Sequence, residues 1–152
     1  MINTGNAKED EILFATKRYD RLVNDNSKKI DGLICPFRLH QEDFAQVLGI
    51  SSYDKYETGE QKYLPKLFRV LRNHSKDPIA DQLKLWGMIV YDFLVGNTDN
   101  HIKNLSLVYS KSLREKRLAP AYDIVSTAIY PSSSREMAIG IGGERTLDKI
   151  RR

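Results

Sequence analysis

Apolar side chains recur at helical spacing through the middle of the chain. Apolar residues at positions 64, 67, 68 and 71 predict a helix over 64–73. Asp77 and Pro78 predict the start of a second helix, because an N-cap acid is followed by proline at the first helical position. We expect Gly96 to end this helix. Its apolar residues at spacings of three and four predict the core face, with Tyr91 at that face or its edge: Ile79, Leu83, Trp86, Val90 and Phe93.

Shorter segments complete the pattern. Residues 41–48 have helical spacing and are followed by Gly49, a residue typical of helix C-termini. Pro36 argues against a central strand position for the extended piece 32–39. The remaining expectations are a strand over 11–20, a turn over 24–29, a loop over 51–61, a hairpin formed by 105–109 and 117–119, a loop at 132–134 and a turn between short strands at 140–143.

Composition places the chain among ordered cytoplasmic proteins. Of 152 residues, 41% are apolar and 29% are charged, which is enough apolar material for the core of one domain, 1–152. The net charge of +4 fits an anionic ligand such as a nucleotide and is too small to predict nucleic-acid binding. Cys35 is the only cysteine, so we expect a reduced, partly buried thiol. The sequence shows no apolar run of membrane-spanning length and no signal peptide, and both ends look cut.

The candidate chemistry lies in a loop between the long predicted helix and the predicted hairpin. Asp99 and Asn104 are separated by four residues in this loop, and Asp123 follows the hairpin. Phosphoryl transfer needs a carboxylate that orients the attacking hydroxyl, and it needs oxygen ligands for magnesium. Protein kinases use the same spacing of Asp and Asn, with a metal-binding Asp further on. The order of these residues therefore predicts the base and metal ligands of a kinase.

Two blocks carry a family resemblance. Residues 96–104 (GNTDNHIKN) and 118–126 (LAPAYDIVS) resemble the signature of HipA-type serine/threonine protein kinases, the toxins of bacterial toxin–antitoxin pairs. Residues 17–21, 38–49 and 139–144 resemble further blocks of that family, so the resemblance runs from about Phe14 to Ile150. It implies an α+β fold, a mainly helical protein-kinase-like C-lobe with a hinge strand and a catalytic β-hairpin.

The resemblance also implies residue roles. Asp99 would be the catalytic base, His101 and Lys103 would lie on the phosphates of ATP, and Asn104 and Asp123 would bind Mg²⁺. A protein with a Ser or Thr hydroxyl would be the substrate, and an antitoxin protein a partner. The other residues expected at the nucleotide are Lys17, Arg18 and Tyr19 at the adenine, Asp20 near the ribose, and Tyr122 beside Asp123.

The chain departs from the family at its start. Nothing before residue 11 supplies the phosphate loop or the strand lysine of an N-lobe, so catalytic activity of the chain by itself is left open. One alternative is a non-catalytic remnant, in which Asp99 caps a turn, His101 is structural and Lys103 is a surface charge. Another is a DNA-binding or antitoxin-interacting module formed by 41–59, which resembles the start of a helix-turn-helix. Residues 52–56 are too short and too weakly amphipathic for a recognition helix, so we do not expect direct nucleic-acid binding.

Overall fold

The computed structural model describes residues 15–150, which combine helices and strands in an α+β fold. These residues divide into two compact units, one ending at Arg38 and one beginning at Leu39. Each unit is described by itself. The first is built of short strands, and the second contains the helices and the candidate chemistry.

The described part of the first unit, residues 15–38, contains two antiparallel strand pairs. β1 (Arg21–Leu22) pairs with β4 (Phe37–Arg38), and β2 (Lys28–Ile30) pairs with β3 (Leu33–Cys35). Pro36 separates β3 from β4, as its missing N–H predicts. The strand predicted over 11–20 is not found in residues 15–20, and residues 11–14 lie outside the described part. Cys35 is exposed rather than partly buried, because no layer among residues 15–38 covers β3.

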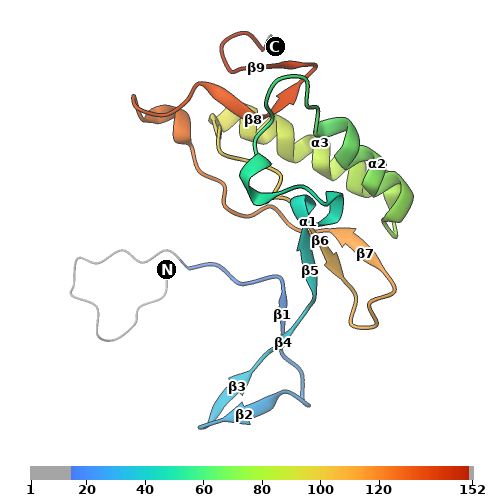
Figure 1. Cartoon of the computed structure of the whole chain (residues 1–152). Coiled ribbons are helices and arrows are strands. Elements are labelled where there is room, and N and C mark those ends of the chain that lie inside the picture. The colour runs from blue at the N-terminus through green and yellow to red at the C-terminus, as the bar shows by residue number, and fades with distance from the viewer. Residues whose placement is uncertain (1–14, 151–152) are drawn as a thin grey trace, which may run out of the picture. The chain divides into compact units, whose positions relative to one another are not determined.

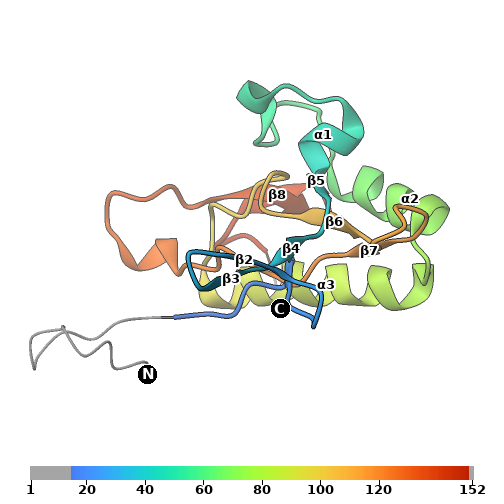
Figure 2. The same ribbon diagram turned by 90° about the horizontal axis from the view of Figure 1, so that it is seen from below.

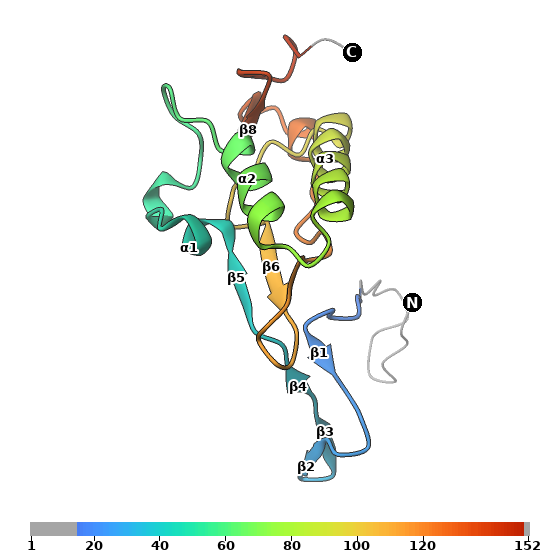
Figure 3. The ribbon, with the colours of Figure 1, turned by 90° about the vertical axis from the view of Figure 1, so that its right-hand side faces the viewer.

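The second unit is organised around an antiparallel three-stranded sheet with the order β5–β6–β7. Its strands are β5 (Gln41–Asp43), β6 (Ser106–Tyr109) and β7 (Lys116–Leu118), and the predicted β6–β7 hairpin is confirmed. The helices α2 (Leu64–His74) and α3 (Pro78–Val95) lie side by side (Figures 1 and 3), and both contact β7. Figure 2 shows α3 running along one side of this sheet.

A second hairpin closes the unit. β8 (Glu136–Ile141) and β9 (Glu144–Thr146) pair through a two-residue turn, Gly142–Gly143, in which both residues have positive φ. The predicted turn between short strands is therefore confirmed, and β8 contacts α2. The hydrophobic core of the second unit contains these buried side chains: Phe44, Ala45, Tyr63, Leu64, Leu67, Leu71, Leu85, Ile89, Ile102, Leu105, Leu107, Leu118 and Ile139.

The predicted helix 41–48 begins later than its spacing indicated. Helix α1 is Phe44–Leu48, and 41–43 form β5 instead. Asp43 and Gln46 build a reciprocal capping box at its start, with two hydrogen bonds of 2.9 Å, and Gly49 ends it at φ 64°. Pairing of 41–43 with β6 is a long-range interaction, so the local pattern could not show it.

The bounds predicted for α3 are confirmed, but its predicted core face is wrong. Asp77 accepts a hydrogen bond from the backbone N–H of Ala80 at 3.2 Å, and Gly96 ends the helix at φ 70°. Ile79 and Leu83 are 72% and 68% exposed, while the buried residues of the helix are Asp81, Leu85, Ile89 and Asp92. Apolar residues of α3 lie on most sides of the helix, so their spacing was compatible with more than one buried face. The same error placed Trp86 and Tyr91 in or beside the core, whereas both are exposed.

Candidate functional site

The loop after α3 is organised by a buried carboxylate at the end of that helix. Asp92 is 3% exposed. Its Oδ1 accepts a hydrogen bond of 2.8 Å from Asn97 Nδ2, and its Oδ2 accepts one from Asn100 Nδ2. The backbone carbonyl of Asp92 also accepts from the N–H of Asn97 at 2.8 Å. Burial raises the pKa of Asp92, and the two amide donors act in the opposite direction. Two asparagines of the loop are thus fixed to one carboxylate.

Asp99 and Asn104 meet through the backbone of this loop. The carbonyl of Asp99 accepts hydrogen bonds from the N–H of His101 at 2.8 Å and from Nδ2 of Asn104 at 3.2 Å. The amide nitrogen of Asn104 orients the side chain through this bond, and Oδ1 is the amide atom able to bind a cation. The Asp99 side chain is exposed, and its Oδ1 accepts a hydrogen bond of 2.6 Å from the hydroxyl of Tyr56. This bond and partial burial raise the pKa of Tyr56 to about 12.

His101 is buried and faces a lysine. Its Nε2 lies 2.9 Å from Nζ of Lys55, and the ring is 7% exposed. Burial lowers the pKa of His101, and the charge of Lys55 adds to that effect. The ring is therefore neutral near pH 7, with Nε2 accepting from Lys55, and Nδ1 has no hydrogen-bond partner within residues 15–150. Asp99 and Asp123 act in the opposite direction on this pKa, so both carboxylates lie within electrostatic reach of the ring.

The segment with Asp123 is fastened to the same loop by its neighbour. The Tyr122 hydroxyl donates to the carbonyl of Lys103 at 3.0 Å and lies 2.6 Å from Oγ of Ser106. Asp123 is exposed and has φ 56°, a left-handed conformation that aspartate tolerates better than most residues. A small pocket is lined from both sides, by Asn100 and Asn104 of the loop and by residues around Asp123, among them Tyr122 and Ile124. The structure therefore brings the two predicted blocks together.

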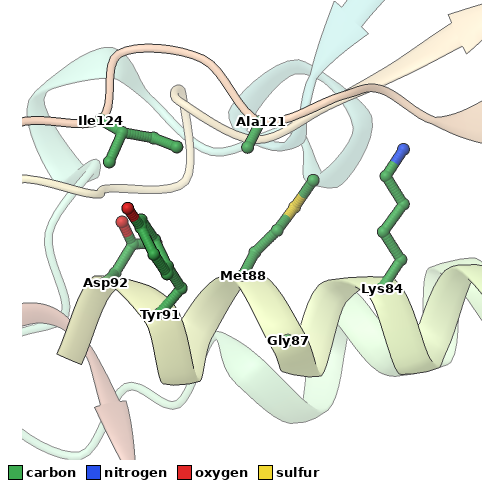
Figure 4. A pocket seen from close by; sticks show the side chains of 7 residues that line it. All are labelled: Lys84, Gly87, Met88, Tyr91, Asp92, Ala121 and Ile124. Atoms are coloured by element: carbon green, nitrogen blue, oxygen red, sulfur yellow. The ribbon is translucent and has the colours of Figure 1, made fainter. Parts of the chain in front are cut away.

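A wider groove runs between α3 and the segment that leads to Asp123. Figure 4 shows Met88, Tyr91 and Asp92 on the helix facing Ala121 and Ile124 across it. Its volume is about 280 Å³, and Lys84 closes one end, where Nζ donates to the carbonyl of Leu118 at 3.0 Å.

The predicted hinge residues belong to the first unit. Lys17 and Arg18 are exposed, Tyr19 is half-buried and Asp20 is 1% exposed. Both carboxylate oxygens of Asp20 accept 2.8 Å bonds from Arg18, and Arg21 adds a bond of 2.6 Å. The hydrogen bonds from Arg18 hold the pKa of Asp20 below its ordinary value.

Three residues of the site were missed by sequence reasoning. Lys55 and Tyr56 stand in a polar loop over forty positions before their partners, and no local pattern marks them. Asp92 did carry a signal, because it is a charged residue in the last turns of a strongly apolar helix. A carboxylate there needs donors, and Asn97 and Asn100 follow within the next eight positions.

Comparison with known proteins defines the class. The model of the HipA-like C-terminal domain matches residues 1–151, so the chain belongs to this family. A protein named "Putative kinase Y4mE" from Sinorhizobium fredii is 38% identical over 134 residues, which are 88% of this chain and 30% of that protein. The serine/threonine-protein kinase toxin HipA of Shewanella oneidensis is 30% identical over 139 residues, covering 84% of this chain and 30% of the toxin.

A solved structure agrees with the family. The chain superposes with a TM-score of 0.68 and 27% identity on a chain from the Shewanella oneidensis complex of HipA, HipB and its operator DNA. The match covers 88% of this chain and 32% of that chain. The resemblance to HipA-type proteins is thus confirmed, and the chain spans about a third of the length of the relatives it matches. No helix within residues 15–150 is long and apolar enough to cross a membrane.

Proposed function

We propose that this chain provides the base and the metal ligands of an ATP- and Mg²⁺-dependent protein serine/threonine kinase of the HipA type, with the architecture of a kinase C-lobe. The observation that carries the proposal is the joining of two sequence blocks. Asp99 and Asn104 share a loop that Tyr122 binds directly, which holds Asp123 beside it. If Asp99 only capped a turn, its loop would not need to contact the segment that carries Asp123.

The proposed reaction needs little covalent chemistry from the protein. Asp99 accepts the proton of a Ser or Thr hydroxyl while that oxygen bonds to the γ-phosphorus of ATP and the bond to ADP breaks. Mg²⁺, when bound, neutralises charge on the phosphates. Its protein ligands would be Oδ1 of Asn104 and the carboxylate of Asp123, a set that fits because Mg²⁺ in such sites takes one or two protein ligands and completes its shell with phosphate and water.

We do not expect His101 and Lys103 to contribute equally to binding the phosphates of ATP. His101 is neutral and buried, so its ring supports the loop more than it attracts an anion. Lys103 is only half-buried, so its side chain can reach an anion outside the loop. We assign the main phosphate contact to Lys103, with Lys55 as a second cation beside His101. The adenine and ribose contacts proposed for residues 17–20 use the backbone of that segment, since Asp20 is occupied by arginines.

Partners are proposed from the relatives. HipA of Shewanella oneidensis is solved in complex with HipB and operator DNA, so an antitoxin protein is a proposed partner of this chain as well. The alternative of a DNA-binding module receives no support from the residues expected to form it. Residues 41–59 contain α1 and a three-residue 3-10 helix at Ser52–Asp54, whereas a helix-turn-helix needs a full second helix in the major groove.

Calorimetric titration of the chain with ATP in the presence of Mg²⁺ tests the proposal. The wild-type chain and Asp25→Ala, which changes an exposed turn of the first unit, are expected to bind alike. Asp123→Ala is expected to lose the Mg²⁺-dependent part of the binding. Absence of binding in the wild type, or equal binding by Asp123→Ala, would favour a non-catalytic remnant.

The assignment of Asp99 as the catalytic base is tested by a separate variant. Asp99→Asn keeps the shape of the side chain but cannot take up a proton. It is expected to bind MgATP as the wild type does and to abolish phosphoryl transfer when the chain is joined to a nucleotide-covering lobe. Full transfer by this variant would show that another group is the base.

A further inference from the structure

Three consecutive residues before α2 each make a side-chain hydrogen bond to a residue elsewhere in the second unit. Nζ of Lys55 contacts His101, the hydroxyl of Tyr56 donates to Asp99, and the carboxylate of Glu57 turns into the core. Two of these contacts end on the loop that carries the proposed base. We call residues 55–57 the support segment.

Glu57 anchors the support segment. It is 1% exposed, and its two oxygens accept hydrogen bonds from the backbone N–H groups of Tyr63 at 2.5 Å and Gly140 at 2.8 Å. Its own backbone N–H donates to the carbonyl of Ala138 at 3.0 Å. A Cβ at position 140 would lie 2.8 Å from Oε2 of Glu57, so glycine is required there for this bond. The support segment is therefore attached firmly to β8.

The loop of Asp99 is attached to the same strand. The N–H of Ala138 donates to the carbonyl of Thr98 at 3.1 Å, directly before Asp99. The N–H of Ile102 reaches the carbonyl of Lys55 at 3.4 Å. Strand β8 thus holds both the backbone beside Asp99 and the backbone beside Tyr56, which fixes the distance between the phenol and the carboxylate.

We propose that Tyr56 is the positioning residue of Asp99: its phenol holds Oδ1, so that Oδ2 faces the acceptor hydroxyl of the substrate. Oδ2 has no hydrogen-bond partner among residues 15–150, and the Asp99 side chain is exposed on a loop. An exposed carboxylate without such a bond rotates among several rotamers. The 2.6 Å hydrogen bond from Tyr56 removes that freedom before the substrate binds. This matters for the reaction, because misplacement of a reacting group by about 1 Å can lower the rate about 100-fold.

This inference rests on the proposed function, because it assigns Asp99 as the base, but its test needs no turnover. The χ1 couplings of Asp99 are measured by NMR in the isotope-labelled chain. The wild type is expected to show one rotamer. Tyr56→Phe, which removes only the hydroxyl, is expected to show averaging over several rotamers with an unchanged thermal midpoint.

Tyr53→Phe is the matched control. Tyr53 lies in the 3-10 helix just before the support segment and is 93% exposed. Its variant is expected to leave the Asp99 couplings as in the wild type. Gly140→Ala is a second variant, because displacement of Glu57 should move the support segment and release Asp99 without touching either side chain of the bond. A single Asp99 rotamer in Tyr56→Phe would overturn the inference.

The proposed function is judged separately in the same samples. Tyr56→Phe acts on the acceptor side, so its MgATP affinity is expected to equal that of the wild type. If neither protein binds MgATP while Asp99 still loses its single rotamer, the proposed function fails and the positioning contact stands. If both bind MgATP and the rotamer is unchanged, only the inference about Tyr56 fails.

Discussion

Among single residues, the site depends on buried polar groups whose hydrogen bonds shape the loop of Asp99. Asp92 is the clearest case, because it holds Asn97 and Asn100 on either side of Asp99. A buried carboxylate is unfavourable unless donors satisfy it, and here the donors belong to the functional loop. The same bonds that satisfy Asp92 therefore shape the loop.

Asp92→Ala is expected to destabilise the chain by about 2–4 kcal/mol, since it leaves two buried amide donors without an acceptor. Denaturant unfolding measures the loss. Tyr91→Ala, which truncates the exposed neighbour, is expected to stay within about 0.5 kcal/mol of the wild type. Equal losses in the two variants would contradict the role given to Asp92.

His101 gives the chain a pH dependence in the mildly acidic range. Burial lowers its pKa below the ordinary value of 6.5, so the folded chain binds this proton more weakly than the unfolded chain does. The stability from the neutral ring is present above that value and is lost as pH falls below it. The free energy of unfolding should therefore fall as the pH drops below the ordinary value of 6.5.

His101→Gln is expected to flatten this part of the pH profile. His74→Gln, at the exposed end of α2, should leave the slope as in the wild type. Urea unfolding at a series of pH values measures both. A slope that survives in His101→Gln would assign the titration to another group.

At the scale of elements, a second buried carboxylate joins α3 to the hairpin. Asp81 is 1% exposed and accepts bonds from Ser75 at 2.5 Å, from the Arg117 guanidinium at 3.1 Å and from the N–H of Leu118 at 2.8 Å. Burial acts to raise the pKa of Asp81, but these hydrogen bonds outweigh it and the pKa is lowered. This side chain therefore links α3, which precedes the loop, to β7, which follows it.

Asp81→Ala is expected to cost about 2–3 kcal/mol, because it leaves the buried N–H of Leu118 unpaired and separates Arg117 from α3. Asp77→Ala, which removes the N-cap of the same helix, should cost only about 1 kcal/mol. Thermal or denaturant unfolding ranks the two. The reverse order would show that the cap, rather than the link to β7, dominates.

At the scale of the whole molecule, α3 buries one face and exposes another that is also apolar. Ile79, Leu83 and Trp86 lie on the exposed face, while Leu85 and Ile89 are buried against the core. Their spacing alone cannot distinguish the two faces, because apolar residues occupy both.

Leu83→Lys is therefore expected to change the free energy of unfolding by less than about 0.5 kcal/mol, as for an ordinary surface position. Leu85→Ala should cost about 2–5 kcal/mol, because it opens a cavity in the core. The two variants lie two positions apart on one helix, so a large loss in Leu83→Lys would mean that the outer face is covered in solution.

Local signals were sufficient for much of the fold. The Asp77–Pro78 start and the Gly96 end of α3, the β6–β7 hairpin and the glycine turn before β9 follow from caps, breakers and short-range pairing. These features depend on residues within a few positions of one another. The family resemblance also came from contiguous motifs, which the sequence displays without any folding.

Asp99, Asn104 and Asp123 stand in contiguous blocks, so these candidates could be predicted without a structure. The residues that surround them could not be predicted, because they come from distant parts of the chain. β8 brings the support segment to the loop of Asp99, and thereby Tyr56 to its carboxylate and Lys55 to His101. These distances are set by backbone hydrogen bonds that join β8 to two loop segments distant from it in the sequence, and no period or motif along the chain encodes those bonds.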